Sequence, residues 1–377
     1  MNPLSESTAA IECRDVWKIF GVRAGDALTA IRREMLSKQE ILSRFGCVVG
    51  VGGVSFSVAR GETLCIMGLS GSGKSTLVRH VNRLIEPTSG EVLVDGEDIG
   101  RKSASDLRRI RARKIGMVFQ HVALFPHRSV WRNVAYGLEV QGVAKAARRA
   151  TALAKLNLMH LGEYSERMPH ELSGGQQQRV GLARALATDP DVLLMDEPFS
   201  ALDPLIRRQL QDQFLDLAKV VRKSTIFITH DLEEAMRLGD RVAIMRESRF
   251  VQVGTPDQIL LHPADEYVRD FVQGVPRLKI LRARSVMEPL PQSQPGRSGA
   301  ALLETCPRMR AETKLEELVR LVVETELPVV VTDENDRDVG IITRRALLRS
   351  MEADASWDTP SASAAAVATT AVLDPAE

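Results

Sequence analysis

The sequence is short of cysteine, of net charge and of long apolar runs. Its cysteines are Cys13, Cys47, Cys65 and Cys306. They are scattered without CxxC spacing, which argues against a zinc site or a disulfide framework and is typical of the reducing cytoplasm. The formal net charge is only +1, so no broad basic surface and no nucleic-acid partner are expected.

Secretory and membrane-spanning segments are also missing. The N-terminal stretch MNPLSESTAAIECRD is polar and lacks the apolar centre of a signal peptide. The longest apolar runs, such as VLLM and VVV, fall far short of the ~20 residues that cross a bilayer. We therefore expect the chain itself to be soluble.

Short apolar runs alternate with helical patterns through most of the chain. The runs TLCIM, VLLMD, TIFIT and RVAIM are typical of parallel strands that are buried on both faces of a sheet. The stretches GGVSFSVA and GEVLVDGE alternate or carry turn residues, which favours an antiparallel β subdomain beside the main sheet. The predicted fold class is α/β, with a mainly parallel sheet core, an antiparallel β subdomain and a helical subdomain.

Composition also predicts the domain boundaries. A Pro/Gln/Ser-rich stretch indicates a linker, and the Ala/Ser/Thr-rich end indicates disorder. The predicted parts are a main α/β domain at 11–273 with an insertion at 22–51 and a helical subdomain at 121–172, a linker at 274–300, a small α+β module at 301–352, and a disordered tail at 353–377. The linker contains a predicted cationic strip: Arg277, Lys279, Arg282 and Arg284.

The stretch GLSGSGKST has the pattern of a phosphate-binding loop, or P-loop, between an apolar strand and a helix. Its predicted nucleotide-binding residues are Gly68, Leu69, Ser70, Gly71, Ser72, Gly73, Lys74, Ser75 and Thr76. Glycines let backbone N–H groups turn toward phosphate oxygens, and the helix N-terminus adds a favourable dipole. We expect Lys74 to reach the β- and γ-phosphates of ATP, and the Ser75 hydroxyl to bind Mg²⁺.

Polar residues follow the ends of three other predicted strands. Asp196 and Glu197 end DVLLMDEP, where Asp196 suits a Mg²⁺ contact and Glu197 suits the role of catalytic base for water. His230 follows IFIT and is predicted to contact the γ-phosphate, although a lone histidine is more often structural. Gln120 follows IGMVF and is a candidate to contact Mg²⁺ or water.

A second glycine-rich element, SGGQ, opens another helix. Ser173 is well placed as an N-cap, and Gly174 and Gly175 leave room for an anion beside it, with Gln176 next in the chain. Two such phosphate-binding elements of one compact sheet cannot usefully enclose the same phosphate group. If this element binds phosphate, the phosphate is therefore expected to belong to a second copy of the chain; otherwise it is an ordinary capped helix.

Together these elements resemble the ATP-binding cassette (ABC) ATPases, from about Ile11 to Gln273. The P-loop, the Gln120 loop, LSGGQ, LLMDE, SALD and His230 occur in the order and spacing of that family. The resemblance implies a head-to-tail homodimer with Mg²⁺ and ATP, in which Ser173, Gly174, Gly175, Gln176 and Asp203 serve the partner's nucleotide. It also implies an aromatic side chain against adenine: Phe20 occupies the usual position, and Trp17 is the alternative.

Within that family the chain is similar to the quaternary-amine uptake class, which imports glycine betaine, proline betaine, carnitine or choline. The similarity is carried by KIFG…LSKQEILSRFGCVVGV, EPFSALDPLIRRQLQ and THDLEEAMRLGDRVAIM. It implies a peripheral subunit at the cytoplasmic face of the plasma membrane, with permease subunits and, indirectly, a substrate-binding protein. LPVVVTDENDRDVGIIT resembles half of a cystathionine-β-synthase (CBS) module, and what precedes it is too short for a first half.

Other functions are weighed against this interpretation. An amino-acid importer ATPase with a regulatory domain is the nearest alternative. A non-transport cassette ATPase of translation or DNA repair commonly has two cassettes or a long coiled-coil insertion, and neither pattern is present in this sequence. A CBS sensor with a degenerate cassette is opposed by the intact Lys74, Asp196 and Glu197.

Overall fold

The computed structural model describes residues 9–120, 122–200, 202–290, 305–325 and 327–351. The predicted disordered tail at 353–377 lies outside these residues. The chain divides into two compact units, Met1–Pro276 and Arg277–Glu377, and each is described by itself. Within the described ranges, no helix combines the length and the hydropathy needed to span a membrane.

The first unit is built on a six-stranded sheet with the order β10-β9-β3-β8-β7-β6. Its strands are β3 (Thr63–Met67), β6 (Ile115–Val118), β7 (Val192–Asp196), β8 (Ser224–Thr229), β9 (Arg241–Arg246) and β10 (Arg249–Gly254). All neighbours are parallel except β9 and β10. Every residue of β3, β7 and β8 is buried, as expected for strands covered on both faces. The predicted parallel core is confirmed.

A four-stranded antiparallel sheet with the order β2-β1-β4-β5 accompanies it. Its strands are β1 (Ala9–Phe20), β2 (Val48–Ala59), β4 (Ser89–Val94) and β5 (Glu97–Asp98). One hydrophobic core joins the two sheets: Ile11 and Val58 of this sheet cluster with Ile66 and Ile226 of the central sheet. The expected antiparallel subdomain is therefore present and packed on the main sheet.

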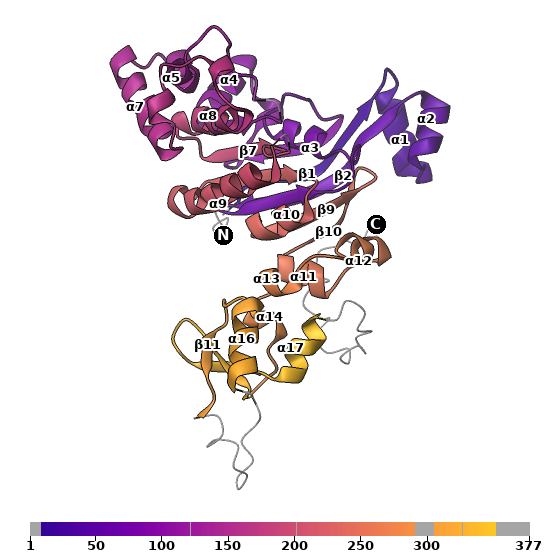
Figure 1. The fold of residues 1–377 in the computed structure, drawn as a ribbon. Helices are drawn as coiled ribbons and strands as arrows, with labels where there is room; N and C mark the ends of the chain where they lie inside the picture. The colour runs from indigo at the N-terminus through magenta and orange to yellow at the C-terminus, as the bar shows by residue number, and fades with distance from the viewer. Residues whose placement is uncertain (1–8, 121, 201, 291–304, 326, 352–377) are drawn as a thin grey trace, which may run out of the picture. The chain divides into compact units, whose positions relative to one another are not determined.

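Figure 1 shows α4, α5, α7 and α8 lying together, with α1 and α2 apart from them. The helices are α1 (Ala24–Glu34), α2 (Lys38–Phe45), α3 (Lys74–Val81), α4 (Ala104–Arg113), α5 (Val130–Val134), α6 (Tyr136–Val140), α7 (Lys145–Leu158), α8 (Gly174–Ala187), α9 (Pro204–Val221), α10 (Leu232–Leu238), α11 (Pro256–Leu261) and α12 (Glu266–Phe271). Short 3₁₀ turns are formed by Ile99–Arg101, Gly162–Tyr164 and Pro169–Glu171.

The insertion forms the helical pair α1 and α2. Ser37 caps α2 in a reciprocal capping box with Glu40, and Gly46 ends the helix in the left-handed conformation that favours glycine. Ile31 of α1 and Ile41 of α2 are buried in one cluster with Val49 at the start of β2. The insertion is therefore packed onto the first residues of β2.

The second unit contains a three-stranded sheet with the order β11-β12-β13. Its elements are α13 (Arg277–Ile280), α14 (Ala283–Val286), β11 (Arg308–Arg310), α16 (Leu315–Thr325), β12 (Val329–Thr332), β13 (Asp338–Ile342) and α17 (Arg344–Met351). The expected order of helix, strand, turn, strand and helix is present from α16 to α17.

The first half of the predicted linker differs from the expectation. Residues 277–288 form α13 and α14 and belong to the second unit. Ala283 N–H bonds to the Thr313 carbonyl at 2.8 Å, and Glu288 bridges to Ile341 of β13. The polar composition hid these contacts because the partners lie more than twenty residues downstream. The predicted cationic strip also differs from the expectation, because two of its four residues, Arg282 and Arg284, form ion pairs with Glu312.

Candidate functional site

The P-loop joins buried β3 to α3. Gly68, Gly71 and Gly73 have φ values of 150°, 77° and 105°, which L side chains rarely adopt. A Cβ atom on Gly68 would lie 2.1 Å from the carbonyl oxygen of Met245, and one on Gly73 would lie 2.2 Å from that of Gly50. The loop therefore packs backbone against backbone, while the Cβ position of Gly71 faces open space.

Lys74, at the start of α3, is almost fully buried. Its Nζ donates hydrogen bonds to the carbonyl oxygens of Gly68 at 2.7 Å and Leu69 at 3.1 Å. Burial lowers the pKa of Lys74, and the carboxylates of Glu197 and Asp196 act in the opposite direction. A buried ammonium group at the start of a helix favours an anion such as phosphate.

Ser75 and Asp196 meet as predicted from their motifs. The Ser75 hydroxyl donates to Asp196 Oδ1 at 2.8 Å, and Asp196 is buried at the end of β7. Arg79 Nη2 contacts the other oxygen, Oδ2, at 3.3 Å. Sequence reasoning missed Arg79, although it lies four residues after Ser75 on one helix, a spacing that places both on one face.

Glu197 is held between two other predicted residues. Gln120 Nε2 donates to Glu197 Oε2 at 3.2 Å, and His230 Nδ1 lies 3.4 Å from the same oxygen. The backbone of Glu197 has a φ of 48°, and its N–H bonds to the Ile228 carbonyl on neighbouring β8. This turn aims the carboxylate out of β7 toward the loops that follow β6 and β8.

The oxygen donors fit a Mg²⁺ ion that is bound together with a nucleotide. The Ser75 hydroxyl and the Asp196 carboxylate are ligands of the kind that Mg²⁺ prefers. Across the described residues, no group of three or more His, Cys, Asp or Glu side chains is arranged to hold a metal. Phosphate oxygens and water are needed to complete the coordination, which is the usual way Mg²⁺ binds in such sites.

The second glycine-rich element caps α8. The Ser173 hydroxyl accepts a hydrogen bond from Gln176 N–H at 3.3 Å, and Gln176 Oε1 accepts one from Ser173 N–H at 2.9 Å. The Cβ position of Gly174 is open, whereas one on Gly175 would lie 2.6 Å from the Ile206 side chain. Among the described residues, no hydrogen bond or ion pair joins Ser173–Gln176 to the P-loop.

Asp203 is the N-cap of α9, and its Oδ1 accepts from Ile206 N–H at 3.0 Å. Ile206 is also the residue that packs against Gly175, so Asp203 lies close to the start of α8. The N-terminus of α8 and the N-terminus of α9 therefore lie next to each other.

The two aromatic candidates for adenine differ in exposure. Phe20 is 42% exposed, and its ring lies over Gly50, where a Cβ atom would be 2.6 Å from it and 3.5 Å from Thr76 of α3. Trp17 is 7% exposed, and its indole N–H donates to Asp15 at 2.7 Å. Phe20 is therefore partly exposed near the P-loop helix, and Trp17 is a core residue.

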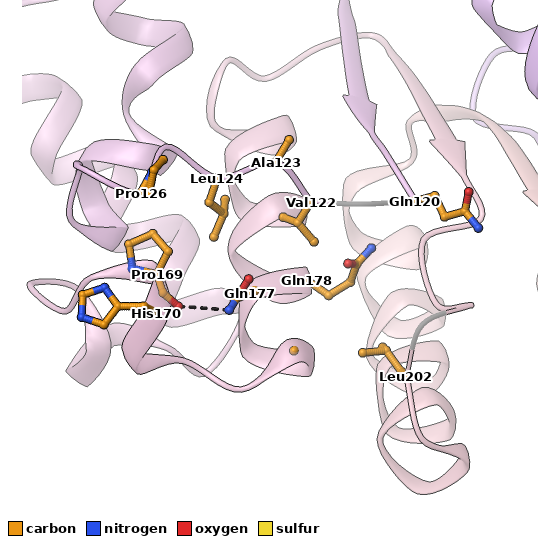
Figure 2. A pocket seen from close by; sticks show the side chains of 11 residues that line it. Gln120, Val122, Ala123, Leu124, Pro126, Pro169, His170, Gln177, Gln178 and Leu202 are labelled. Atoms are coloured by element: carbon orange, nitrogen blue, oxygen red, sulfur yellow. Dashed lines mark hydrogen bonds between the residues drawn. The ribbon is translucent and has the colours of Figure 1, made fainter.

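A groove of about 490 Å³ lies beside Gln120 (Figure 2). Its lining includes Val122, Leu124 and Pro126 from the segment after Gln120, and Gln177 and Gln178 from α8. Arg184 of α8 supports this segment by donating to the carbonyl oxygens of Val122 and Ala123 at 2.7 and 3.0 Å. The groove therefore connects the Gln120 loop with the helix that begins at Ser173.

Comparison with known proteins agrees with this geometry. The family model described as "ABC transporter" matches residues 51–200, and the model described as "CBS domain" matches residues 307–353. A glycine betaine/carnitine transport ATP-binding protein of Listeria monocytogenes is 52% identical over 277 residues, covering 74% of this chain and 70% of the relative. A glycine betaine/proline betaine transport ATP-binding protein of Salmonella typhimurium is 43% identical over 91% of this chain and 97% of the relative.

A trimethylamine N-oxide transport ATP-binding protein of Pelagibacter ubique is 43% identical over 89% of this chain and 95% of its own length. The solved dimer of the ATP-binding cassette MJ0796 with ADP and Pi has a TM-score of 0.55 at 29% identity, covering 65% of this chain and 98% of that one. Fold and site are thus those of an ATP-binding cassette. The chain belongs to the ABC transporter family, as an ATP-hydrolysing subunit that also carries a CBS domain.

Proposed function

We propose that this chain powers the import of a quaternary amine osmolyte, such as glycine betaine, proline betaine, carnitine or choline. It does so as a homodimer bound to a separate permease at the cytoplasmic face of the plasma membrane. The observation that supports ATP hydrolysis best is the contact of Glu197 with both Gln120 and His230, next to the Ser75–Asp196 pair.

The P-loop residues bind the nucleotide in this proposal. Backbone N–H groups of the loop and the ammonium group of Lys74 hold the phosphates, and Phe20 stacks on adenine. Ser75 and Asp196 hold Mg²⁺, with Gln120 nearby, and the ion neutralises phosphate charge when bound. Lys74 then exchanges its bonds to the Gly68 and Leu69 carbonyls for bonds to phosphate oxygens.

Glu197 acts as the base that orients and deprotonates the attacking water. Gln120 and His230 restrict its carboxylate by binding one oxygen, Oε2, which leaves Oε1 for the water. His230 is 54% exposed at its side chain, so it is also free to contact the γ-phosphate. The three residues come from the ends of three neighbouring strands, where ligand groups of such sheets collect.

The cap of α8 serves the nucleotide of the other subunit. Its Ser173 hydroxyl and open Gly174 form a second anion cradle, and no described polar contact joins this cradle to the P-loop of the same chain. The solved relative MJ0796 is a dimer. Hydrolysis then needs two copies of the chain, with Asp203 at the neighbouring cap coupling the two sites.

The groove beside Gln120 is the docking site for a permease helix. Its apolar lining by Val122, Leu124 and Pro126 suits a short amphipathic helix. Because α8 and the Gln120 loop both line this groove, movement of a docked helix would shift both of them. It would thereby affect Glu197, which is bonded to Gln120, and the anion-binding element at Ser173. A substrate-binding protein delivers the amine to the permease and does not touch this chain.

The proposal is tested by reconstituting the chain in proteoliposomes with a permease and a substrate-binding protein of the same organism. We expect ATP-dependent uptake of labelled glycine betaine, competed by proline betaine, carnitine or choline, and no uptake with Glu197→Gln. The Pelagibacter ubique relative makes trimethylamine N-oxide a second candidate substrate. Uptake of glutamine or histidine instead of betaine would identify an amino-acid importer and refute the proposal.

A further inference from the structure

The turn between β9 and β10 holds a buried serine in an unusual backbone conformation. Ser248 is 1% exposed and has a φ of 69°, in the left-handed region that favours glycine. Its neighbour Glu247 shares this conformation, with a φ of 49°, but is exposed. None of the functional motifs includes this turn, and nothing in its sequence, MRESRF, points to a site.

Ser248 bonds to two other segments through three different groups. Its N–H donates to the Ser72 carbonyl in the P-loop at 3.1 Å. Its hydroxyl donates to the Val49 carbonyl in β2 at 2.9 Å, and its own carbonyl accepts from Gly52 N–H at 2.8 Å. One residue therefore ties the turn, the P-loop and β2 together.

The P-loop depends on these two neighbours for its shape. The backbone of the loop packs directly on the backbone of these two segments. Cβ atoms on Gly68 and Gly73 would lie about 2 Å from the carbonyl oxygens of Met245 and Gly50. Met245 is three residues before Ser248, and Gly50 follows Val49. A shift of either segment would move the loop's N–H groups away from the phosphate oxygens.

Val49 is a fixed anchor for the serine hydroxyl. Its side chain is buried in one cluster with Trp17, Ile31 and Ile41, so the insertion helices hold this part of β2 in place. The hydroxyl of Ser248 therefore connects the β9–β10 turn, which supports the P-loop, to a packed hydrophobic cluster formed by β1, β2 and the insertion helices.

We propose that Ser248 is a positioning residue for the P-loop, which holds it in the phosphate-binding shape by anchoring the β9–β10 turn to Val49. Ser248 touches no reacting atom, so it acts on nucleotide affinity and leaves the chemical step unchanged once ATP is bound. This inference rests on the ATPase activity and is independent of the transported substrate.

The test compares Ser248→Gly with Glu247→Gly. Glycine accepts the left-handed φ at both positions, and both changes add a similar freedom to the unfolded chain. Only Ser248→Gly removes the bond to Val49. The measurements are the Kd of a fluorescent ATP analogue, the KM for ATP, kcat at saturating ATP, and the Tm.

Loss of one buried hydrogen bond should raise Kd and KM about three- to tenfold in Ser248→Gly, with kcat within about twofold of the wild type. Glu247→Gly should keep the wild-type Kd and KM. The inference is overturned if the two variants bind nucleotide equally well, or if Ser248→Gly loses kcat while KM stays unchanged. A wild-type chain that fails to hydrolyse ATP would instead refute the ATPase assignment.

Discussion

Phe20 and Trp17 show how a single side chain's surroundings decide its role. Both are aromatic residues of β1. The Trp17 side chain is buried in the hydrophobic cluster that includes Ile31 and Ile41, and its indole N–H is bonded to Asp15. Phe20 is 42% exposed, and Lys18 Nζ lies over its ring at 5.1 Å from the centroid. An adenine ring stacked there would replace water on an already apolar surface.

Phe20→Ala should therefore weaken ATP binding about tenfold, because stacking of a base on an aromatic ring contributes about 1–3 kcal/mol. Phe20→Tyr should keep near wild-type affinity, since it preserves the ring. Trp17→Phe serves as the control and should lower the Tm while leaving ATP affinity almost unchanged. Titration with a fluorescent ATP analogue measures all three, and equal affinities of Phe20→Ala and the wild type would contradict the assignment.

The residues proposed to bind the nucleotide and its Mg²⁺ could be predicted from the sequence because their pattern is local. Lys74 and Ser75 follow from one glycine-rich stretch, and Asp196 from the end of an apolar strand. Ser248 was not predictable, because its partners Val49 and Ser72 lie 199 and 176 positions away, and a serine in a turn has no distinguishing pattern. The joint contact of Gln120 and His230 with one oxygen of Glu197 likewise needs the folded sheet.

At the scale of elements, the helices after β7 and β8 are joined by a buried polar contact. Gln211 Nε2 of α9 donates to Glu234 Oε1 of α10 at 3.0 Å, and both side chains are buried. Asp203 is the N-cap of α9 and α10 follows His230, so this contact links the helix capped by Asp203 to the helix that follows His230.

Burial raises the pKa of Glu234, which the bonds from Thr229 and Gln211 only partly oppose. The folded chain therefore binds this proton more tightly than the unfolded chain, and the contribution of Glu234 to stability falls as pH rises from about 4.5 through the raised pKa. The glutamine of Glu234→Gln does not titrate, so this variant does not lose stability in the same way. Its free energy of unfolding should therefore increase relative to that of the wild type as pH rises over that range.

The Tm of both proteins, measured from pH 4.5 to 8, checks this prediction. The same change at exposed Glu233 controls for the loss of one carboxylate. A Tm difference between Glu234→Gln and the wild type that is constant with pH would contradict it.

A second prediction at this scale concerns the N-terminal caps of α8 and α9. Ser173→Arg fills the open cradle and Lys74→Ala removes the phosphate contact, so each variant alone should be inactive. A heterodimer of the two still has one intact composite site, and a random mixture should recover about a quarter of the wild-type rate. Ser173→Arg alone should keep the nucleotide affinity of the isolated monomer, because its cradle serves the partner.

ATPase assays of the mixtures test this, with affinity tags on each variant to quantify heterodimers. Mixtures that contain heterodimers but hydrolyse no ATP would contradict two independently working composite sites. Weaker nucleotide binding by the Ser173→Arg monomer would contradict the role in trans.

The strand pattern was largely predictable from the sequence, because runs such as TLCIM and VLLMD are long enough to fill a buried strand of β3 or β7. The helices α13 and α14 were not predictable, since each is a single turn of four residues. They are held by distant elements: α13 packs on α16 and α17, and α14 contacts β13 and bonds to Thr313. Local composition cannot report such non-local pairing.

At the scale of the whole molecule, every residue assigned to nucleotide binding lies in the unit that ends at Pro276. In the second unit, a groove of about 550 Å³ is lined by Arg344, Arg345, Leu348 and Arg349 of α17. Arg282 and Arg284, by contrast, are engaged with Glu312. Three arginines of α17 therefore lie around one groove, which makes this helix a candidate contact for an anionic surface.

A chain that ends at Pro276 should keep its basal ATPase rate within about twofold, because it retains the complete site. What should change is the response to salt. Contacts between α17 and anionic lipid are screened over about 8 Å at physiological ionic strength, so they weaken as salt rises and release the second unit. The full-length transporter should then respond to salt in anionic vesicles, and the truncated one should not.

Uptake is measured in proteoliposomes of anionic and of zwitterionic lipid, each titrated with salt. The triple variant Arg344→Gln, Arg345→Gln, Arg349→Gln should behave like the truncated chain, since it removes the charge while keeping the unit. The double variant Arg282→Gln, Arg284→Gln is the matched control and should retain the response, because those cations already pair with Glu312. Identical salt responses of the full-length and truncated chains in anionic vesicles would show that this unit is not the sensor.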